Sequence, residues 1–175
     1  MASINNIAIK GLKTFKDHEG VDIYQGNIYY KNKNLGHWSQ DLWGGPDDFS
    51  FDTKILDEEV KRIKNNPSFV DKGIKEYGPM YKNILDLSTI IYEIIKMMDD
   101  ERMLKKAIKS GYEGIVKIYG GSIVSYIYIP KTENWEERYK EPIDNARNSI
   151  ENSSSKNKGS KIEMFNSLEQ FNLQY

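Results

Sequence analysis

The chain has 175 residues, enough for one well-packed core with a small satellite module, so we expect a single domain over residues 1–175. Its 25 Lys and Arg against 26 Asp and Glu give a formal net charge of -1, which argues against a free-standing, non-specific nucleic-acid binder. A net charge near zero still permits a local basic patch that binds nucleic acid held by a partner protein. The absence of cysteine excludes disulfides, thiolate nucleophiles and cysteine-ligated metal sites.

The sequence favours a cytoplasmic protein. Its amino terminus lacks a basic segment followed by a long apolar run, and its most apolar stretch is interrupted by Glu93 and Lys96. A chain without cysteine also suits a reducing compartment. We therefore expect no contact with a membrane.

Two segments near the amino terminus predict β-strands. Apolar and polar residues alternate over residues 7–16 with a change of phase at Gly11, and they alternate again over residues 21–31 with a change of phase at Gly26. A glycine at such a change of phase is typical of a β-bulge, so we expect one bulge in each strand.

Two turns extend this predicted sheet. Residues 31–34 are polar and contain two asparagines, which tolerate left-handed backbone angles, so they predict a hairpin turn into a strand over residues 35–41. Residues 44–48, Gly-Gly-Pro-Asp-Asp, predict a second turn before a short strand at residues 49–51. Residues 5–52 are therefore expected to form an antiparallel β-hairpin module, which needs a cover for its apolar face.

The middle of the chain predicts helices that supply this cover. Apolar residues recur at intervals of three and four over residues 55–65, residues 69–78 and, most clearly, residues 86–110. Asp86 is expected to cap the long helix and Gly111 to end it, because these residue types satisfy the free backbone groups at helix ends.

A second hairpin is predicted at residues 113–129. Two β-branched runs are divided there by Gly120 and Gly121, the composition of a two-residue hairpin turn. The predicted fold class is therefore α+β, with the N-terminal hairpin module packed on a helical core that carries this second hairpin.

The last part of the chain predicts helices and a loop. Residues 133–151 are expected to form a helix that Pro142 breaks or kinks. Residues 151–160 have the composition of a flexible loop, and the apolar spacing of residues 161–175 predicts a returning helix.

Acid/base chemistry is suggested by the two histidines, His18 and His37, which both fall within the N-terminal module. Two imidazoles beside a phosphodiester can act as base and acid in ribonuclease-type chemistry, and Lys31 and Lys33 can stabilise the charge that develops on the phosphate. Asp41 follows His37 closely and completes the catalytic candidates. The alternative is that each histidine is a surface residue beside a turn.

Acidic residues gather in the same module. They are Asp17, Glu19, Asp22, Asp41, Asp47 and Asp48. Carboxylates from two loops can hold a magnesium ion that activates water on a phosphate ester. Ordinary turn chemistry explains the same residues, so we expect no metal or other cofactor, with magnesium as the alternative.

The module is also rich in aromatic side chains. They are Tyr24, Tyr29, Tyr30, Trp38 and Trp43. Aromatic faces on a strand can stack unpaired bases, and they can equally form a sheet's own core or a protein-binding hot spot. Tyr29, Tyr30 and Trp38, together with Lys31 and Lys33, are the candidates for contacts with RNA or with a protein partner.

A pattern of residues over roughly the first fifty positions carries a resemblance to known proteins. It consists of Gly11-Leu-Lys-Thr-Phe15, His18-Glu19-Gly20, Tyr24, Gly26-Asn27-Ile28-Tyr29-Tyr30, Gly36-His37-Trp38, Asp41 and Gly44-Gly45-Pro46-Asp47-Asp48-Phe49. The pattern resembles the N-terminal module of small proteins of Firmicutes mobile elements, among them anti-CRISPR proteins of streptococcal elements that inactivate type II-A Cas9.

The resemblance implies an inhibitor of Cas9 that causes truncation of the guide RNA, with Cas9 and its guide RNA as partners. It assigns no catalytic residues, so the candidates above rest on the residues themselves. One alternative is a non-enzymatic inhibitor that binds Cas9 or its guide RNA and blocks assembly of the complex. A second is a small regulatory or structural protein of a mobile element with no role on nucleic acid.

Overall fold

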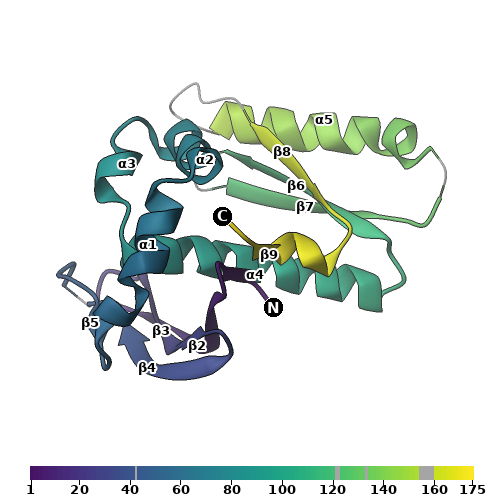
Figure 1. The fold of residues 1–175 in the computed structure, drawn as a ribbon. Helices are drawn as coiled ribbons and strands as arrows, with labels where there is room; N and C mark the ends of the chain where they lie inside the picture. Colours follow the sequence, from purple (N-terminus) through teal and green to yellow (C-terminus); the bar gives the residue numbers. More distant parts are fainter. Residues whose placement is uncertain (42, 121–122, 133, 154–159) are drawn as a thin grey trace. The chain divides into compact units, whose positions relative to one another are not determined.

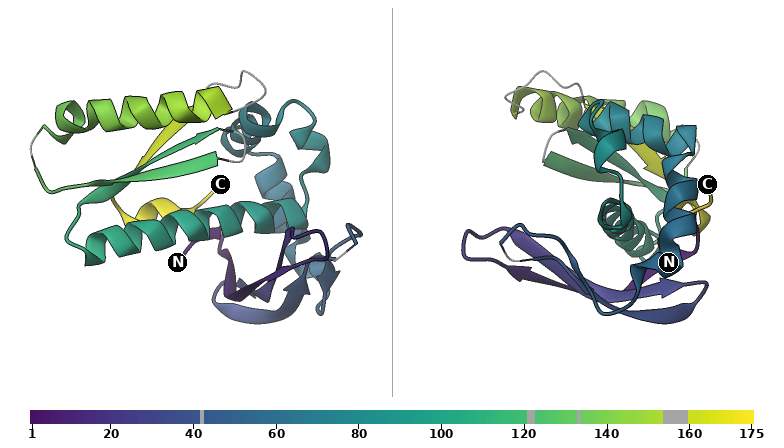
Figure 2. Two further views of the ribbon diagram at one scale, coloured as in Figure 1. Left: turned by 180° about the vertical axis from the view of Figure 1, so that it is seen from behind. Right: turned by 60° about the vertical axis from the view of Figure 1, so that its left-hand side comes forward.

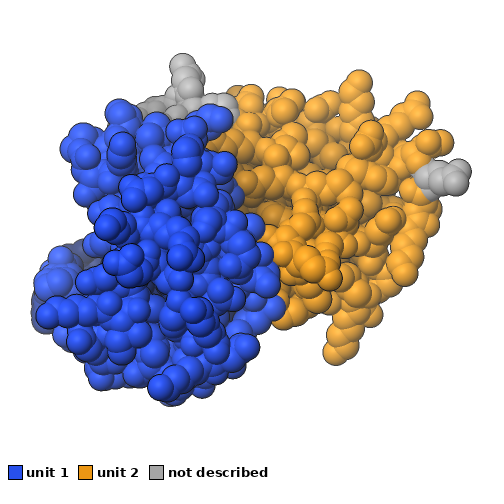
Figure 3. Space-filling model, viewed as in Figure 1, with its two compact units in different colours: residues 1–98, 171–175 blue, residues 99–170 orange. Residues whose placement is uncertain are grey.

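A computed structural model describes residues 1–41, 43–120, 123–132, 134–153 and 160–175. Over these residues the chain forms five α-helices and two β-sheets, which confirms the predicted α+β class (Figure 1). The chain divides into two compact units, one of residues 1–98 with 171–175 and one of residues 99–170 (Figure 3). That the two units form a single domain stays a prediction.

The first unit contains a six-stranded sheet, as expected from the hairpin module. Its spatial order is β5-β4-β3-β2-β1-β9, and all neighbours are antiparallel except β1 and β9. The strands are β1 (Ser3–Ile4), β2 (Ile7–Lys16), β3 (Asp22–Tyr30), β4 (Lys33–Ser39), β5 (Asp48–Phe49) and β9 (Asn172–Leu173). The pairing of β1 with the far end of the chain adds two strands that the sequence did not predict.

The predicted hairpin between β3 and β4 is confirmed, and its turn is shorter than the four residues predicted. Tyr30 pairs with Lys33, so the turn has only two central residues, Lys31 and Asn32. Their φ angles are 49° and 66°, the left-handed values that a type I′ turn needs. Lys33 therefore belongs to β4 rather than to the turn.

One β-bulge lies in β2 where Gly11 predicted it. Lys10 pairs with Asn27 and Lys13 with Gln25, so Gly11 and Leu12 together lie opposite Gly26. The φ angle of Gly11 is 64°, which glycine adopts without strain.

The bulge predicted at Gly26 was wrong, because this glycine lies opposite the bulge of β2. A Cβ atom on Gly26 would lie 2.9 Å from Cγ2 of Ile9, so glycine is needed there for close approach of the two strands. The second irregularity of the sheet lies in β4, where Ile28 pairs with Gly36 but Tyr29 with Asn34.

Helices follow the sheet, preceded by a short 3-10 helix at Thr53–Leu56. The three predicted helices are α1 (Asp57–Lys64), α2 (Pro67–Tyr77) and α4 (Leu87–Lys109), and a short helix that the sequence did not predict, α3 (Tyr81–Ile84), lies between the last two. Asp86 caps α4 as expected, with its carboxylate accepting a hydrogen bond from the Thr89 backbone N–H at 2.8 Å, and Gly111 follows the helix with a φ angle of 87°. Among the described residues no helix is both long and apolar enough to cross a membrane.

One face of the first sheet is buried against helices. Ile9, Ile28 and Trp38 are at most 1% exposed, and Figure 2 shows α1 and α4 on one side of this sheet. The Tyr30 hydroxyl donates to Glu59 of α1 at 2.8 Å, which identifies the buried face as the one toward the helices. The helices thus supply the cover that a small sheet needs.

A partly buried ion-pair network joins α2 to α4. The Lys96 ammonium lies 2.5 Å from the Glu76 carboxylate and 3.3 Å from that of Glu93, and it also bonds the Tyr77 hydroxyl. Burial alone lowers the pKa of Lys96, but the two carboxylates outweigh it and raise the pKa, so the ammonium stays charged.

The carboxyl terminus closes the first unit. The Asn5 side chain donates to the Tyr175 carbonyl at 3.1 Å and accepts from the Tyr175 N–H at 2.6 Å. Phe171 is 1% exposed. The last residues are therefore part of the core of this unit, although they are far in sequence from the other strands of its sheet.

The returning helix predicted for residues 161–175 was wrong. This segment contains β8 (Lys161–Phe165), a 3-10 helix at Leu168–Phe171 and β9. Residues 161–165 all pair with residues 115–119 of the strand β6, and the hydrogen bonds of that ladder outweigh an apolar spacing that also fits a helix.

The second unit is a three-stranded antiparallel sheet with a helix on it. The strands β6 (Gly114–Gly120), β7 (Ile123–Ile129) and β8 have the order β7-β6-β8, and the helix is α5 (Trp135–Ser153). A cluster of Val116, Ile118, Ile129 and Ile150 joins the helix to the sheet. The predicted second hairpin is confirmed, although Gly121 of its turn lies outside the described residues.

The predicted helix near residue 135 is confirmed, and it continues through Pro142 instead of breaking there. Most of the loop expected at residues 151–160 lies outside the described residues.

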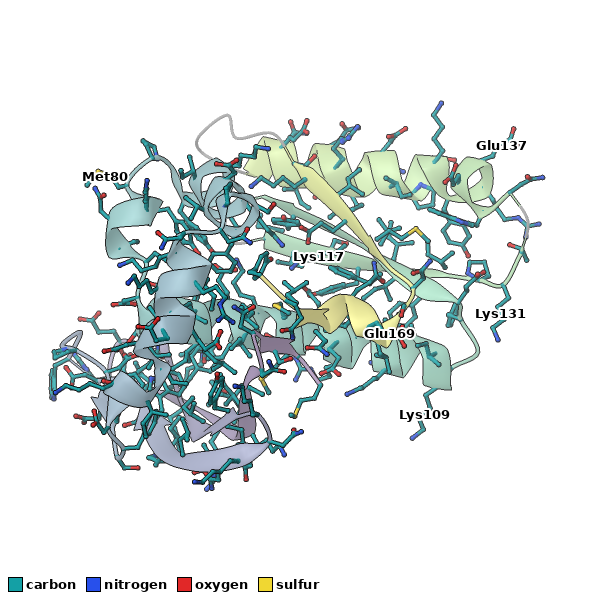
Figure 4. All side chains as sticks on the ribbon, in the orientation of Figure 1. Met80, Lys109, Lys117, Lys131, Glu137 and Glu169 are labelled. Carbon is teal, nitrogen blue, oxygen red and sulfur yellow. The ribbon has the colours of Figure 1, made fainter. Side chains whose placement is uncertain are left out.

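The other face of the second sheet contains a buried ion pair. The ammonium of Lys117, which is labelled in Figure 4, lies 2.8 Å from the Asp100 carboxylate. The two side chains are 9% and 7% exposed. The Tyr126 hydroxyl donates to the other oxygen of Asp100 at 2.6 Å. Burial, helped by this hydrogen bond, raises the pKa of Tyr126, so the hydroxyl keeps its proton and remains a donor.

The substitution Phe171→Ala should destabilise the protein strongly. We expect a loss of about 3–5 kcal/mol in the free energy of unfolding, because a buried ring is replaced by a cavity. Urea unfolding followed by circular dichroism measures it. The control is Leu168→Ala, whose side chain is 39% exposed and which should cost less than about 1 kcal/mol. Equal losses would contradict the anchoring role of Phe171.

The substitution Lys117→Ala should also destabilise the protein, by about 3–5 kcal/mol, because it leaves the Asp100 carboxylate buried without its cation. Thermal and urea unfolding both report this change. Arg102→Ala removes a solvent-exposed ion pair with Asp99 from the same helix and should cost less than about 1 kcal/mol. A small effect of Lys117→Ala would show that the pair is not a structural element.

Candidate functional site

The exposed face of the N-terminal sheet carries a row of polar side chains. Lys10 of β2 pairs with Asn27 of β3, and Asn27 pairs with His37 of β4. Paired residues project to the same side of a sheet, and successive residues project to opposite sides. Because Ile9 and Ile28 face the helices, these three residues face away from them, and His37 is exposed to solvent.

An aromatic ring lies beside this row. Tyr29 is two residues beyond Asn27 on β3 and therefore shares its face. The Lys10 ammonium lies 4.1 Å from the centre of the Tyr29 ring, a cation–π contact that holds both side chains over the strand. The next row along the sheet is Lys13, Gln25 and Ser39. We call Lys10, Lys13, Asn27, Tyr29 and His37 the open face.

The hairpin turn extends the open face. Tyr29, Lys31 and Asn32 line a shallow cavity of about 230 Å³ together with Ala8 and the Met1 end of the chain. The Lys31 ammonium lies 4.9 Å from the centre of the Tyr30 ring, and Lys33 is exposed at the start of β4. Of the predicted contact residues, Tyr29 and Lys31 are thus brought together.

Tyr30 and Trp38 lie on the opposite side, toward the helices. Trp38 is 1% exposed, and its indole N–H donates to the Asp47 carboxylate at 2.8 Å. Tyr30 bonds Glu59 as described above. These two side chains hold the sheet to its cover and to the following loop, so neither joins Tyr29 on the open face.

A larger cavity lies at the other end of the sheet. It has a volume of about 550 Å³ and lies between the turn at residues 17–20 and the loop at residues 40–47. His18 and Asp41 both line it. The His18 ring contacts Trp43 with a centroid distance of 5.0 Å, and Trp43 is 79% exposed.

The structure does not bring the two histidines together. His37 lies opposite Asn27, whereas His18 belongs to the turn before Asp22. Five residues of β3 separate those two positions, which corresponds to about 17 Å along the strand. His37 also does not line the cavity of His18. A single site with both imidazoles would need a different arrangement, and a catalytic role for either one stays a prediction.

The carboxylates around the larger cavity hold its two loops. Asp17 accepts the backbone N–H groups of Glu19 and Val21, both at 2.8 Å, and Asp41 accepts that of Gly45 at 2.6 Å. This is the turn chemistry that the sequence suggested. Within the described part of the chain, no three His, Cys, Asp or Glu side chains lie close enough to hold a metal ion.

Sequence reasoning missed Lys10 and Asn27 as partners of His37. Their alternation with buried isoleucines was visible, but the pairing of Lys10 with Asn27 depends on the bulge at Gly11, which sets the register. It also missed the contact of Trp43 with His18, since the two residues lie on loops whose approach only the fold defines.

Comparisons with known proteins identified no similar protein. No protein-family model, no curated protein and no solved structure matches the chain. The functional argument therefore rests on the two regions described here and on the resemblance of the first fifty or so residues.

Separate positions for the histidines can be tested by NMR. In the variant Trp43→Ala, the imidazole proton resonances of His18 should move toward the values of an unstructured histidine, because they lose the ring current of the indole. The resonances of His37 should stay unchanged. Equal shifts of both histidines would contradict the separation described here.

Proposed function

We propose that this protein inhibits type II-A Cas9 by binding the guide RNA held on Cas9 through the open face of its N-terminal sheet. The observation that supports this proposal is the row of Lys10, Asn27 and His37 beside Tyr29 on one solvent-facing surface. Cas9 and its guide RNA enter from the resemblance of the first fifty or so residues to anti-CRISPR proteins.

The open face has the chemistry that unpaired RNA needs. A tyrosine ring on a strand can stack a base, and Lys10 and Lys13 can neutralise phosphates beside it. Asn27 and His37 add hydrogen-bonding groups beside the tyrosine on the same face. Each of these side chains comes from a strand, so the sheet holds them at fixed spacing.

The same face is too weakly charged to act alone. It offers two lysines, Lys31 of the turn lies beside Tyr29, and the whole chain has a net charge of -1. Affinity for a free RNA strand depends on the number of phosphates that are neutralised, so a few lysines give weak binding at physiological salt. RNA already held by Cas9 would supply the missing affinity through the protein partner.

Cleavage of the guide RNA is the second candidate function, and the exposure of His37 favours it. His37 and Lys10 lie on either side of Asn27, about 10 Å apart by the usual spacing of strands. An imidazole and an ammonium that flank one phosphodiester can move a proton and stabilise developing charge. His18 fits this role less well, because the carboxylates around its cavity repel phosphate.

A denaturing gel separates the two candidates. Cas9, guide RNA and this protein are incubated together, and RNA length is compared with DNA cleavage by the same mixture. Intact guide RNA with lost DNA cleavage is expected from the binding proposal. A shortened guide RNA that His37→Ala leaves intact would favour cleavage, and His18→Ala serves as the matched variant. Full DNA cleavage with intact RNA would overturn both.

The substitution Lys10→Ala should weaken binding of the protein to the Cas9–guide RNA complex. Loss of one phosphate contact should lower the slope of log affinity against log salt by about 0.7, the value for single strands. Fluorescence anisotropy at several salt concentrations measures it. Lys64→Ala removes an exposed lysine from α1, outside the sheet, and should leave the slope unchanged. The proposal fails if the two variants behave alike.

A further inference from the structure

The cavity of His18 is a second surface with its own chemistry. We infer that it docks a lysine or arginine side chain from a basic segment of a partner protein. We call this cavity the acidic recess, and its lining residues are Asp17, His18, Glu19, Val21, Asp22, Ile23, Gln40, Asp41, Trp43, Gly44, Gly45 and Asp47. It lies at the other end of the sheet and His37 is not among its lining residues, so this inference does not depend on the proposed function.

An exposed aromatic ring lies at the edge of the acidic recess. The recess has a volume of about 550 Å³, and Trp43 at its edge is 79% exposed. A large ring left in water costs hydration free energy that contact with a partner removes, and exposed tryptophans are frequent centres of protein interfaces. The contact with His18 fixes one side of the indole and leaves the rest available.

The lining of the acidic recess carries negative charge. Five carboxylates line the recess, those of Asp17, Glu19, Asp22, Asp41 and Asp47, and His18 is the only basic side chain among the lining residues. Asp22 is paired with the Lys16 ammonium at 2.6 Å, so the other four carboxylates give the lining its negative charge. Phosphate is repelled by such a lining. A cationic side chain is attracted to the same lining.

The acidic recess also has the chemistry to bind a long basic side chain. An ammonium or guanidinium group is attracted both to the face of a tryptophan ring and to carboxylates. Val21 and Ile23 offer apolar surface for the methylene stem, which such side chains bury while the charged end meets polar groups. Tryptophan, carboxylates and aliphatic surface thus occur together in the recess.

The recess is held in shape before any partner arrives. Asp41 accepts the Gly45 N–H at 2.6 Å, and a Cβ atom on Gly45 would lie 2.5 Å from the same carboxylate oxygen. Asp47 is fixed by the buried Trp38 indole, and Asp17 by its own turn. A site that needs little ordering loses less entropy on binding, so a short contact can still be specific.

The test uses a fluorescein-labelled hexa-arginine peptide as the probe and the full chain as the receptor, followed by fluorescence anisotropy. We expect saturable binding that Trp43→Ala weakens by about three- to five-fold, the range expected from one exposed cation–π contact. Glu19→Gln should weaken it as well. Both side chains are largely exposed, so both variants should keep the fold, and Trp43→Phe should recover much of the affinity.

The matched control is Glu58→Gln, which removes one exposed carboxylate from α1 and should leave the affinity unchanged. Equal weakening by Glu19→Gln and Glu58→Gln would show general attraction to an acidic surface and overturn the inference. The absence of saturable binding would overturn it too. Tighter binding of a labelled hexa-uridine RNA than of hexa-arginine, lost in Trp43→Ala, would assign the recess to nucleic acid instead.

Discussion

The bulge at Gly11 decides which side of the N-terminal sheet each residue occupies. Side chains alternate along a strand, so a shift of one residue in the pairing of β2 with β3 would exchange the buried and the exposed sets. The bulge places two residues opposite Gly26, and Gly26 has no side chain to resist the approach of Ile9. The isoleucines before the bulge therefore face the helices, and Lys10 and Asn27 face solvent.

Two surfaces of opposite character result from this arrangement. The open face, on both sides of the bulge, combines lysines with Tyr29 and His37, whereas the acidic recess at the other end of the sheet combines carboxylates with Trp43 and His18. One chain with almost no net charge thus presents a surface suited to phosphate and another suited to a cation. We expect a partner that holds RNA on a basic protein surface to offer a ligand to each of the two surfaces.

The sequence predicted most elements of the fold because their signals are local. Turn residues Lys31 and Asn32, the cap at Asp86 and the spacing of the long helix each act within a few positions. The failures concern pairing between distant segments. The strand β8 and the contact of Asn5 with Tyr175 depend on partners far away in the sequence, and no local pattern specifies them.

The sequence predicted which types of residue make up the candidate site, but it did not predict how they are arranged. The residue types in the module pointed to acid/base and stacking chemistry, but Trp38 proved to be a buried anchor and the two histidines lie apart. Burial and register are properties of the folded sheet, so the sequence indicated which side chains can do chemistry and the fold determined which of them can meet.

The most direct measurement is ultraviolet cross-linking of the protein to guide RNA in the complex with Cas9, with the linked peptides identified by mass spectrometry. If the open face binds the RNA, cross-links should occur at Tyr29 and His37 and be absent at Trp43. Cross-links confined to Trp43, or to residues outside the N-terminal sheet, would contradict the account.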